Sequence, residues 1–487
     1  MRILFLLQTL AVDERLGIMT LSAILKKNGH DVQLLITGQL SAEMCLEKIR
    51  AFSPDVLAYS VMTGEHNYHI RLNREIKKSY PCFSVFGGPH PTYQPDMVGQ
   101  PGVDAVCRGE GDIFFPELLR KMGRGEDFFA TQNFWFKKSD GTIVRNEMGP
   151  LVENLDRLPF PDRQVVYEAD TLFRSRGKKT FMSMRGCPYA CSFCFNHAYN
   201  RLTRGKGDVL RYRSVDNVIS EIKAVKAAFP LERVCFEDDT FLLKPAGWLP
   251  EFADRYAREI QLPMTCNVRC DLVDEKVAGL LKKMNCVMVF TGVDPPRKQI
   301  VTEVLKRNVS IEQTVNACRL LKRYGIKVAT ENLLGLPVDN PLEVAMETLD
   351  LNLKIKPYLA VSFMLYPYPG TEIADMAIEK KIFTTDHDKQ TATNRGGTAL
   401  DYGDAQTKTQ LFNLLHLFSI IVQFSFLRPL TSKLISLPVN RLYPQLYFIF
   451  FGYKMLRLSN SKGFVRSVMR YLPFYLKHAR LIWKKEV

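Results

Sequence analysis

Between Gly186 and Cys194 the chain reads GCPYACSFC, which spaces three cysteines as Cys-x3-Cys-x2-Cys. This loop follows directly on a run of strand-forming residues, Thr180–Met184. A cubic 4Fe-4S cluster usually takes four thiolates. Three cysteines in one short loop therefore predict a cluster whose fourth iron stays open, as one position stays open in a catalytic zinc site. The alternatives are a zinc site, for which His197 is the only nearby fourth ligand, or three structural thiols.

Outward from this loop, residues 171–385 alternate strands with helices. Each strand candidate is followed by a helical stretch or its turn, which predicts a parallel sheet closed into an incomplete (β/α)6 barrel. Functional groups of such barrels lie at the carboxyl ends of the strands, where the cysteine loop begins. The six candidates are Thr180–Met184, Arg233–Phe236, Met264–Val268, Val287–Thr291, Lys327–Leu333 and Ala360–Leu365.

The cysteine motif, with an aromatic residue at Phe193, resembles that of the radical S-adenosylmethionine (SAM) superfamily. The resemblance covers about residues 175–385. It implies that SAM chelates the open iron, beside Phe193. One electron from the reduced cluster then cleaves SAM to methionine and a 5′-deoxyadenosyl radical, which abstracts hydrogen from an unactivated C–H bond. Cys187, Cys191 and Cys194 are accordingly the expected cluster ligands.

Three further strand ends resemble SAM-binding segments of this superfamily. Asp238 and Asp239 end the second strand and are expected beside the SAM ammonium group, which a carboxylate would pair with. Arg269, after the third strand, is expected to pair with the SAM carboxylate. Asp294 keeps the acid of the fourth segment, although a Pro pair replaces the usual Ser-Gly. The alternatives are a helix cap for Asp239 and a surface ion pair for Arg269.

Residues 1–125 contain five buried strand runs that alternate with amphipathic helices, which predicts a parallel, doubly wound sheet. Ligands bind such sheets beyond the carboxyl ends of the strands. Loops there are rich in glycine, which permits close approach to a flat, bulky ligand. Together these loops resemble the cobalamin-binding domain of class B radical SAM enzymes. The resemblance implies cofactor contacts by Glu14, Leu16, Gly17, Ser60, Gly87, Gly88, Gly109 and Glu110.

The first loop departs from many cobalamin domains. Val12 and Glu14 stand where those domains carry an Asp and the His that ligates cobalt from below. The corrin is therefore expected base-off, with water or nothing beneath it. The alternative is a vestigial domain or a nucleotide-binding domain, but Gln8–Gly17 lacks the Gly-x-Gly-x-x-Gly run of a dinucleotide fold. His90 is expected to be a hydrogen-bonded loop histidine.

Two further regions complete the chain. Residues 126–170 are expected to be a linker with a short hairpin at Asp140-Gly141. Residues 386–487 are expected to form a helical domain rich in basic and aromatic residues, as in Leu411–Leu427 and Tyr443–Leu458. From Arg428 onward there are twelve Lys or Arg and one acid, which supplies +11 of the net charge of +15. This segment is interpreted as a helical bundle, a substrate cap or a surface for peripheral contact with anionic lipid.

The composition fits a globular, cytoplasmic protein of about three domains. Eleven cysteines without a secretory signal predict reduced thiols rather than disulfides. No run of apolar residues is long enough for a clear membrane span. Nucleic acid is not an expected partner, because no nucleic-acid-binding signature accompanies the basic tail.

These observations predict an enzyme with three cofactors: a 4Fe-4S cluster, SAM and cobalamin. By family resemblance, it methylates an unactivated carbon of a small biosynthetic intermediate, which is hydrophobic or lipid-like. A donor such as flavodoxin or ferredoxin would supply electrons. The first rival is a radical cyclase or rearrangement enzyme with the same cofactors. The second is a methylthiotransferase-like enzyme, with Cys266, Cys270 and Cys286 on a second cluster. A cobalamin carrier without enzymatic activity would leave the cysteine motif unexplained.

Overall fold

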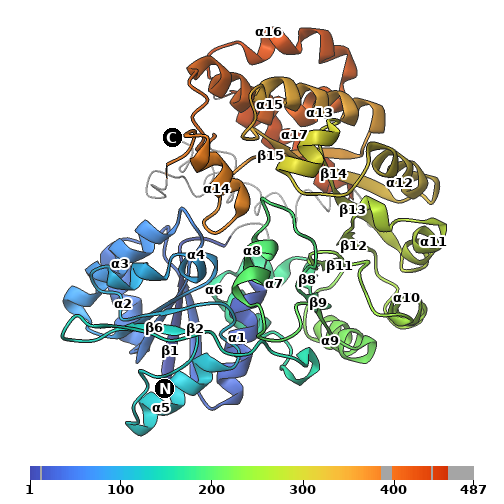
Figure 1. The fold of residues 1–487 in the computed structure, drawn as a ribbon. Coiled ribbons are helices and arrows are strands. Elements are labelled where there is room, and N and C mark those ends of the chain that lie inside the picture. The colour runs from blue at the N-terminus through green and yellow to red at the C-terminus, as the bar shows by residue number, and fades with distance from the viewer. Residues whose placement is uncertain (11–13, 385–396, 440–441, 459–487) are drawn as a thin grey trace. The chain divides into compact units, whose positions relative to one another are not determined.

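A computed structural model describes residues 1–10, 14–384, 397–439 and 442–458 of the chain (Figure 1). The chain divides into two compact units. The first comprises Met1–Ser175 and Ala198–Arg213. The second comprises Arg176–His197 and the described residues from Ser214 onward. The three cysteines of the motif belong to the second unit.

The first unit is built on a seven-stranded sheet in the order β2-β1-β3-β4-β5-β6-β7. Strands β1 to β5 run parallel, as the alternation of strands and helices predicts. The strands are β1 (Arg2–Leu7), β2 (Asp31–Ile36), β3 (Val56–Ser60), β4 (Phe83–Gly87), β5 (Ala105–Cys107), β6 (Phe134–Lys137) and β7 (Ile143–Arg145). The helices between them are α1 (Leu16–Lys27), α2 (Ala42–Phe52), α3 (His66–Ser79), α4 (Pro89–Tyr93), η1 (Pro95–Gly99) and α5 (Phe114–Arg124).

Helices cover both faces of this sheet (Figure 1). Successive side chains of a strand point to opposite faces. Leu4 and Leu6 of β1 therefore pack in one core with residues of α2 and α3. Phe5, between them, meets Phe115 of α5 on the other face, with ring centroids 6.5 Å apart. Strands buried on both faces are typical of doubly wound folds.

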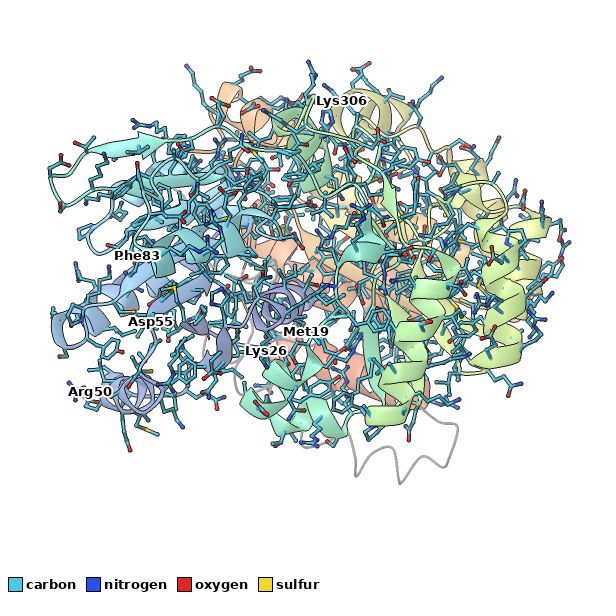
Figure 2. All side chains as sticks on the ribbon, turned by 90° about the horizontal axis from the view of Figure 1, so that it is seen from below. Met19, Lys26, Arg50, Asp55, Phe83 and Lys306 are labelled. Carbon is cyan, nitrogen blue, oxygen red and sulfur yellow. The ribbon has the colours of Figure 1, made fainter. Side chains whose placement is uncertain are left out.

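Residues expected to form a linker instead extend the first unit. The predicted hairpin at Asp140-Gly141 is present, and its strands β6 and β7 join the sheet antiparallel beside β5. After it come η2 (Leu155–Arg157), α6 (Arg163–Ala169) and α7 (Thr171–Ser175). Asp162 ties α6 to α1, because it receives a hydrogen bond from Ser22 (2.7 Å) and an ion pair from Lys26 (2.8 Å). Figure 2 labels Met19 and Lys26 on α1.

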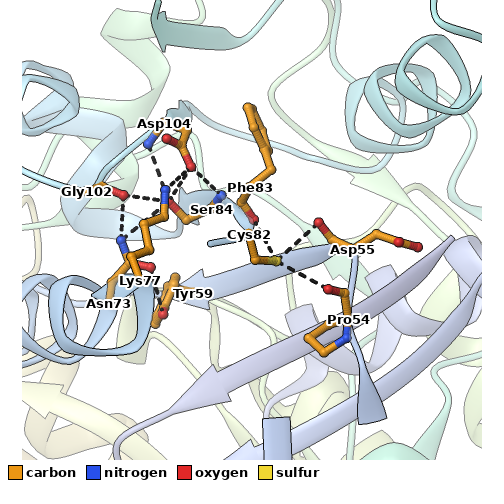
Figure 3. Close-up of polar contacts among 10 residues, drawn as sticks. All are labelled: Pro54, Asp55, Tyr59, Asn73, Lys77, Cys82, Phe83, Ser84, Gly102 and Asp104. Atoms are coloured by element: carbon orange, nitrogen blue, oxygen red, sulfur yellow. Dashed lines mark hydrogen bonds and ion pairs between the residues drawn. The ribbon is translucent and has the colours of Figure 1, made fainter. Parts of the chain in front are cut away.

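A buried polar network joins the amino ends of β3, β4 and β5 (Figure 3). Asp104 accepts hydrogen bonds from the Ser84 backbone N–H (2.7 Å) and from Lys77. Asn73, which is fully buried, accepts from the Tyr59 hydroxyl (3.0 Å) and donates to the Gly102 carbonyl (2.6 Å). Since buried polar groups need partners, this network holds α3 in register with the sheet. It lies at the end of the sheet opposite to the expected cofactor loops.

The second unit contains an open barrel of six parallel strands in the order β15-β14-β13-β12-β11-β8. This confirms the predicted (β/α)6 architecture. The strands are β8 (Lys178–Phe181), β11 (Arg233–Phe236), β12 (Met264–Asn267), β13 (Cys286–Val293), β14 (Lys327–Leu334) and β15 (Leu359–Met364). The short strand β9 (Met184–Arg185) belongs to this unit, whereas the residues of β10 (Arg211–Tyr212) belong to the first. The helices are α8 (Phe195–Leu202), α9 (Val215–Ala228), α10 (Trp248–Glu259), α11 (Glu275–Lys283), α12 (Ile311–Arg323), α13 (Pro341–Ile355) and α14 (Glu372–Glu379), with short turns η3 (Cys270–Leu272) and η4 (Ile300–Val304).

The C-terminal helices pack on the barrel rather than apart from it. They are α15 (Ala405–Gln423), η6 (Ser425–Leu430), α16 (Thr431–Ile435) and α17 (Leu442–Leu458). Apolar residues of α15 form one core with residues of β14, β15 and α13. Leu458 of α17 belongs to a core with Met288, Ala329 and Val361 of the strands. Among the described residues, no helix is long and apolar enough to cross a bilayer.

Candidate functional sites

The cysteine loop lies at the carboxyl end of β8, after the short strand β9. Gly186 has a φ of +92°, a left-handed conformation that glycine adopts without strain. Cys187, Cys191 and Cys194 form no disulfide and are partly exposed, whereas the other cysteines, Cys82 excepted, are buried. A tight turn joins the last two of the three, since the Cys194 N–H donates to the Cys191 carbonyl at 3.0 Å. The thiols are thus accessible to a bulky inorganic group.

Two residues fasten this loop to the barrel. Ser192, between the second and third cysteines, is buried, and its backbone N–H donates to the Leu305 carbonyl at 3.0 Å. Asp239, after β11, accepts hydrogen bonds from the Gly186 backbone and the Asn196 side chain, which flank the loop. Burial raises the pKa of Asp239 despite these bonds. Asp239 therefore positions both ends of the cysteine loop.

Burial raises the pKa of all three thiols, and that of Cys194 rises to about 11. Asp239 and the neighbouring thiols add to this effect for Cys187 and Cys194, which places the three sulfur atoms within electrostatic reach of one another. Metals bind thiolates and displace the thiol protons. The donor set therefore fits an iron–sulfur cluster, whose positive iron atoms would stabilise the thiolate forms.

The zinc alternative demands a different arrangement. A structural zinc ion needs four ligands at one point. Within the described residues, no three His, Cys, Asp or Glu side chains converge in that way. His197 instead hydrogen-bonds Glu372 at 3.0 Å, and Lys306, which Figure 2 labels, pairs with the same carboxylate at 2.6 Å. In a cubic cluster each thiolate binds a separate iron, so the sulfur atoms need not converge.

The cysteines considered for a second cluster lie in the hydrophobic core of the second unit. Cys266, Cys270 and Cys286 are all buried. Cys266 hydrogen-bonds Cys286, and Cys270 hydrogen-bonds Cys318, so that they form two separate thiol pairs. Buried cysteines of this kind behave as small hydrophobic residues.

Asp238, which is expected beside the SAM ammonium group, is held by groups of the protein itself, and its contact with SAM stays a prediction. Its side chain is fully buried. It accepts hydrogen bonds from the backbone N–H groups of Ser183 (2.6 Å) and Met184 (3.2 Å), and it pairs with Lys244 at 3.1 Å. Asp238 therefore fixes the turn between β8 and β9. Its two neighbours, Glu237 and Asp239, are exposed at the strand end.

Arg269 lies beside the cysteine loop. Its guanidinium group stacks on Tyr189 of the loop, 3.5 Å from the ring centroid, and forms a two-pronged pair with Asp271 at 3.0 Å. It also lowers the pKa of Cys191 against the larger effect of burial. Two of the guanidinium nitrogens of Arg269 thus donate to Asp271. Arg269 is therefore suited to orienting Tyr189 and Cys191.

A second arginine near Cys191 is absent from the sequence predictions. Arg307 pairs with Asp294 at 3.2 Å, and both side chains are largely buried. The Arg307 Nε is buried and has no hydrogen-bond partner among the described residues. Gly292 makes room for this group, because a Cβ there would lie 2.6 Å from the Arg307 Nη1. A glycine near a strand end marks such a close approach and is the signal that the sequence contained.

Glu331 of β14 is the other site residue that the sequence predictions omitted. Its neighbours Thr330 and Asn332 are buried against α13, where both bond Asn352 at 2.6 Å. Since strand side chains alternate, Glu331 faces the interior of the barrel. Its pKa is raised by burial and lowered to a smaller extent by Arg307. Glu331 is the one acid of the strand KVATENLL, and that was the available signal.

Phe193 packs beside the barrel core that contains Leu305, Leu336 and Ile373. It remains partly exposed. Apolar residues support one side of its ring, and its expected contact with SAM stays a prediction.

In the first unit, the predicted glycines gather at the carboxyl edge of the sheet. Gly17 is exposed at the start of α1, and no atom lies within 4 Å of the place where its Cβ would be. Gly88 has a φ of +101°, and a Cβ there would lie 3.0 Å from the Val61 backbone. Ser60 ends β3 and is partly exposed. Leu16 and Gly87 are likewise partly exposed. This edge therefore offers small, accessible positions that fit a flat ligand.

The two predicted acids of this edge are anchored to the protein instead. Glu14 is buried and pairs with Arg163 at 2.9 Å, and it also accepts from Tyr167. Glu110 forms a two-pronged pair with Arg211 at 2.7 and 2.8 Å. Both side chains thus have anchoring roles in the protein, and their expected contacts with cobalamin stay predictions.

The other residues of these loops are also well defined. Gly109 has a φ of +69° and donates its N–H to Thr92 at 3.0 Å, so it shapes the loop after β5. His90 is buried, hydrogen-bonds Thr63 at 3.2 Å and stacks on His66, in agreement with a hydrogen-bonded loop histidine. Val12 lies outside the described residues.

Comparison with known proteins gives two family matches. Residues 181–350 match the radical SAM superfamily, and residues 11–119 match the B12 binding domain. An uncharacterised methyltransferase of Pyrococcus horikoshii is 27% identical over 76% of this chain and 80% of that protein. The anaerobic magnesium-protoporphyrin IX monomethyl ester cyclase of Rubrivivax gelatinosus is 25% identical over 77% and 70%. A similar solved structure is that of the radical SAM methyltransferase TsrM from Kitasatospora setae, with cobalamin and a 4Fe-4S cluster bound. Its TM-score is 0.63, and the two chains are 18% identical over 78% of this chain and 75% of that chain.

Proposed function

Because this chain belongs to the cobalamin-binding radical SAM family, we propose that it is a cobalamin-dependent radical SAM methyltransferase. Its substrate would be a small biosynthetic intermediate with an unactivated carbon. The observation that carries the proposal is the accessible loop of Cys187, Cys191 and Cys194 at the mouth of an open six-stranded barrel. The first unit supplies a separate edge that fits a corrin.

We propose that the three cysteines hold a 4Fe-4S cluster. When bound, the cluster with SAM supplies a 5′-deoxyadenosyl radical, and cobalamin supplies the methyl group. The chain's own contribution is rigidity: Ser192 and Asp239 hold the loop at its middle and at its two ends. Residues that orient metal ligands matter for retention of the metal, because changing them commonly weakens metal binding.

SAM binding would rest on charged groups beside this loop. The SAM carboxylate requires a cation, and the unpartnered Nε of Arg307 is the available buried donor. Asp294 holds the Arg307 guanidinium from the other side at 3.2 Å. Asp239 stays the candidate for the SAM ammonium group. Arg269 would hold Tyr189 and Cys191 in place.

For cobalamin, we propose contacts through backbone and small side chains: Leu16, Gly17, Ser60, Gly87, Gly88 and Gly109. Glu14 cannot ligate cobalt from below while it remains buried with Arg163 and Tyr167. This supports a corrin without a protein-derived lower ligand on this loop. A flavodoxin or ferredoxin would reduce the cluster, since reductive SAM cleavage requires one electron.

A second candidate function is a radical cyclisation with the same cofactors. We retain this candidate because the cyclase of Rubrivivax gelatinosus is 25% identical to this chain. The two functions differ in the fate of the SAM methyl group. A methyltransferase transfers it to the product, whereas a cyclase does not.

The test is anaerobic reconstitution of the full chain with iron, sulfide, cobalamin and methyl-labelled SAM. The iron content should be about four per chain, as one cubic cluster requires. SAM should yield 5′-deoxyadenosine, and Cys191→Ala should abolish it. Cys82→Ala is the matched control, because Cys82 is a partly exposed thiol in the other unit.

With candidate small molecules, label should appear in the product. Normal 5′-deoxyadenosine formation by Cys191→Ala would refute the cluster assignment. Turnover without transfer of label would favour the cyclase function.

A further inference from the structure

Exposed hydrophobic side chains gather on the C-terminal helices. Fifteen large hydrophobic residues are exposed among the described residues, and nine of them lie between Phe424 and Tyr453. We call these nine the C-terminal apolar face: Phe424, Phe426, Leu430, Leu437, Val439, Leu442, Leu446, Ile449 and Tyr453. Such a concentration of exposed apolar groups marks an interaction surface.

Within α17 this face is a continuous stripe. Leu442, Leu446, Ile449 and Tyr453 follow one another at intervals of four, three and four residues, so they lie on one side of the helix. The opposite side is also apolar, since Tyr443, Tyr447 and Leu458 are buried. A surface helix normally presents a polar side to water. The exposed side of α17 therefore suits an apolar environment.

The stripe on α17 continues onto η6. The ring of Phe424 contacts both elements: its centroid lies 6.1 Å from that of Phe426 in η6 and 6.3 Å from that of Phe450 in α17. Lys454 of α17 also donates to the Gln423 side chain at the end of α15. Phe426, which is 73% exposed, and Ile449, which is 68% exposed, are the most prominent members. Through Phe424, the exposed Phe426 thus adjoins α17.

The charge around this face has one sign. The sequence from Ala405 to Lys485 contains thirteen Lys or Arg and neither Asp nor Glu. Among the described residues, Lys433 and Arg457 are exposed. Arg428 pairs at 2.6 Å with Asp350, which belongs to the barrel helix α13. A partner that neutralises this segment must be anionic.

We propose that the C-terminal apolar face docks on the surface of an anionic lipid bilayer. A bilayer combines acidic headgroups with an apolar layer just below them, and it accepts basic and apolar side chains together. A second copy of the chain fits less well, because both faces would carry the same positive charge. As an occupant of the face, the segment 459–487 fits less well for the same reason, since it contains seven Lys or Arg and one acid.

The experiment is flotation of the full reconstituted chain with vesicles. One set contains phosphatidylcholine alone, and the other contains equal parts of phosphatidylcholine and phosphatidylglycerol. The test variant is Phe426→Asp with Ile449→Asp. The matched control is Ile311→Asp with Ile378→Asp, which adds the same charge at exposed positions of α12 and α14. All four positions are exposed, so the variants should keep the fold.

The chain should bind the anionic vesicles, and high salt should weaken binding because screening reduces the attraction to lipid charge. The test variant should bind about tenfold more weakly or worse, whereas the control should bind normally. The proposal is overturned if the unmodified chain does not float with anionic vesicles or if both variants bind alike. It is also overturned if the test variant instead abolishes a dimer seen by light scattering. Vesicle binding is measured without turnover, so it can fail independently of the methyltransferase proposal.

Discussion

Removing one partner of the buried pair of Glu14 and Arg163 should strongly destabilise the first unit. The two side chains are only 3% and 2% exposed, and Glu14 also accepts a hydrogen bond from Tyr167. Glu14→Ala removes the carboxylate and leaves the buried guanidinium without this counter-charge. Breaking a buried ion pair in this way costs about 3–5 kcal/mol.

Amide hydrogen exchange measures this cost region by region, which suits a chain of two units. At tenfold per 1.4 kcal/mol, exchange in β1 and α6 should accelerate roughly a hundred- to several-thousand-fold. Glu168→Ala is the matched control, because it removes an exposed acid from α6 and should change exchange little. Combining Glu14→Leu with Arg163→Met should restore much of the protection, since no buried charge then remains.

A different result would show that Glu14 serves the cofactor. If Glu14→Ala kept native exchange protection but weakened cobalamin binding in an absorbance titration, the anchoring role would be refuted. Unchanged exchange together with unchanged cobalamin binding would also contradict the calculated cost.

Three further changes test the remaining anchors. Gly292→Ala should displace the Arg307 guanidinium, because the new Cβ would lie 2.6 Å from the Arg307 Nη1. The Kd for SAM should rise about tenfold, whereas the melting temperature should not change. An unchanged Kd would contradict this role of Arg307. Asp239→Ala should make iron loss to a chelator about 10- to 100-fold easier, and equal retention would show that Asp239 does not hold the loop. Asn73→Ala should destabilise the first unit by about 1–3 kcal/mol, because the buried Tyr59 hydroxyl loses its acceptor, while Ser84 and the Gly102 carbonyl keep their bond to each other. Hydrogen exchange in β3 and β4 measures the effect, and a loss below about 0.5 kcal/mol argues against the network.

Local patterns predicted most of the fold. The predicted run Arg233–Phe236 is a strand with those same bounds. Ser41 caps α2 by accepting from the Met44 N–H at 3.3 Å, and a serine directly before a helical run is a common sign of such a cap. These features depend on periodicity and capping, which neighbouring residues determine. The assignment of residues 126–175 to the first unit depended on distant partners, and the sequence pattern did not reveal it.

The part of the candidate site that sequence could predict is the cysteine loop, because the spacing of the three cysteines lies within one short segment. For the acids that follow a strand in the first unit, the structure shows distant partners within the protein. Glu14 pairs with a residue 149 positions away, and Glu110 with one 101 positions away. Local sequence cannot separate such an anchor from a ligand contact. Arg307 was missed for the converse reason, because its relation to Cys191 and Asp294 exists only in the folded barrel.

Electron paramagnetic resonance of the reduced, anaerobically reconstituted chain tests the central claim most directly. If a cubic cluster on Cys187, Cys191 and Cys194 has one iron without a protein ligand, adding SAM should change the shape of its signal. Zinc in place of iron, or a cluster signal that SAM leaves unaltered, would contradict the account.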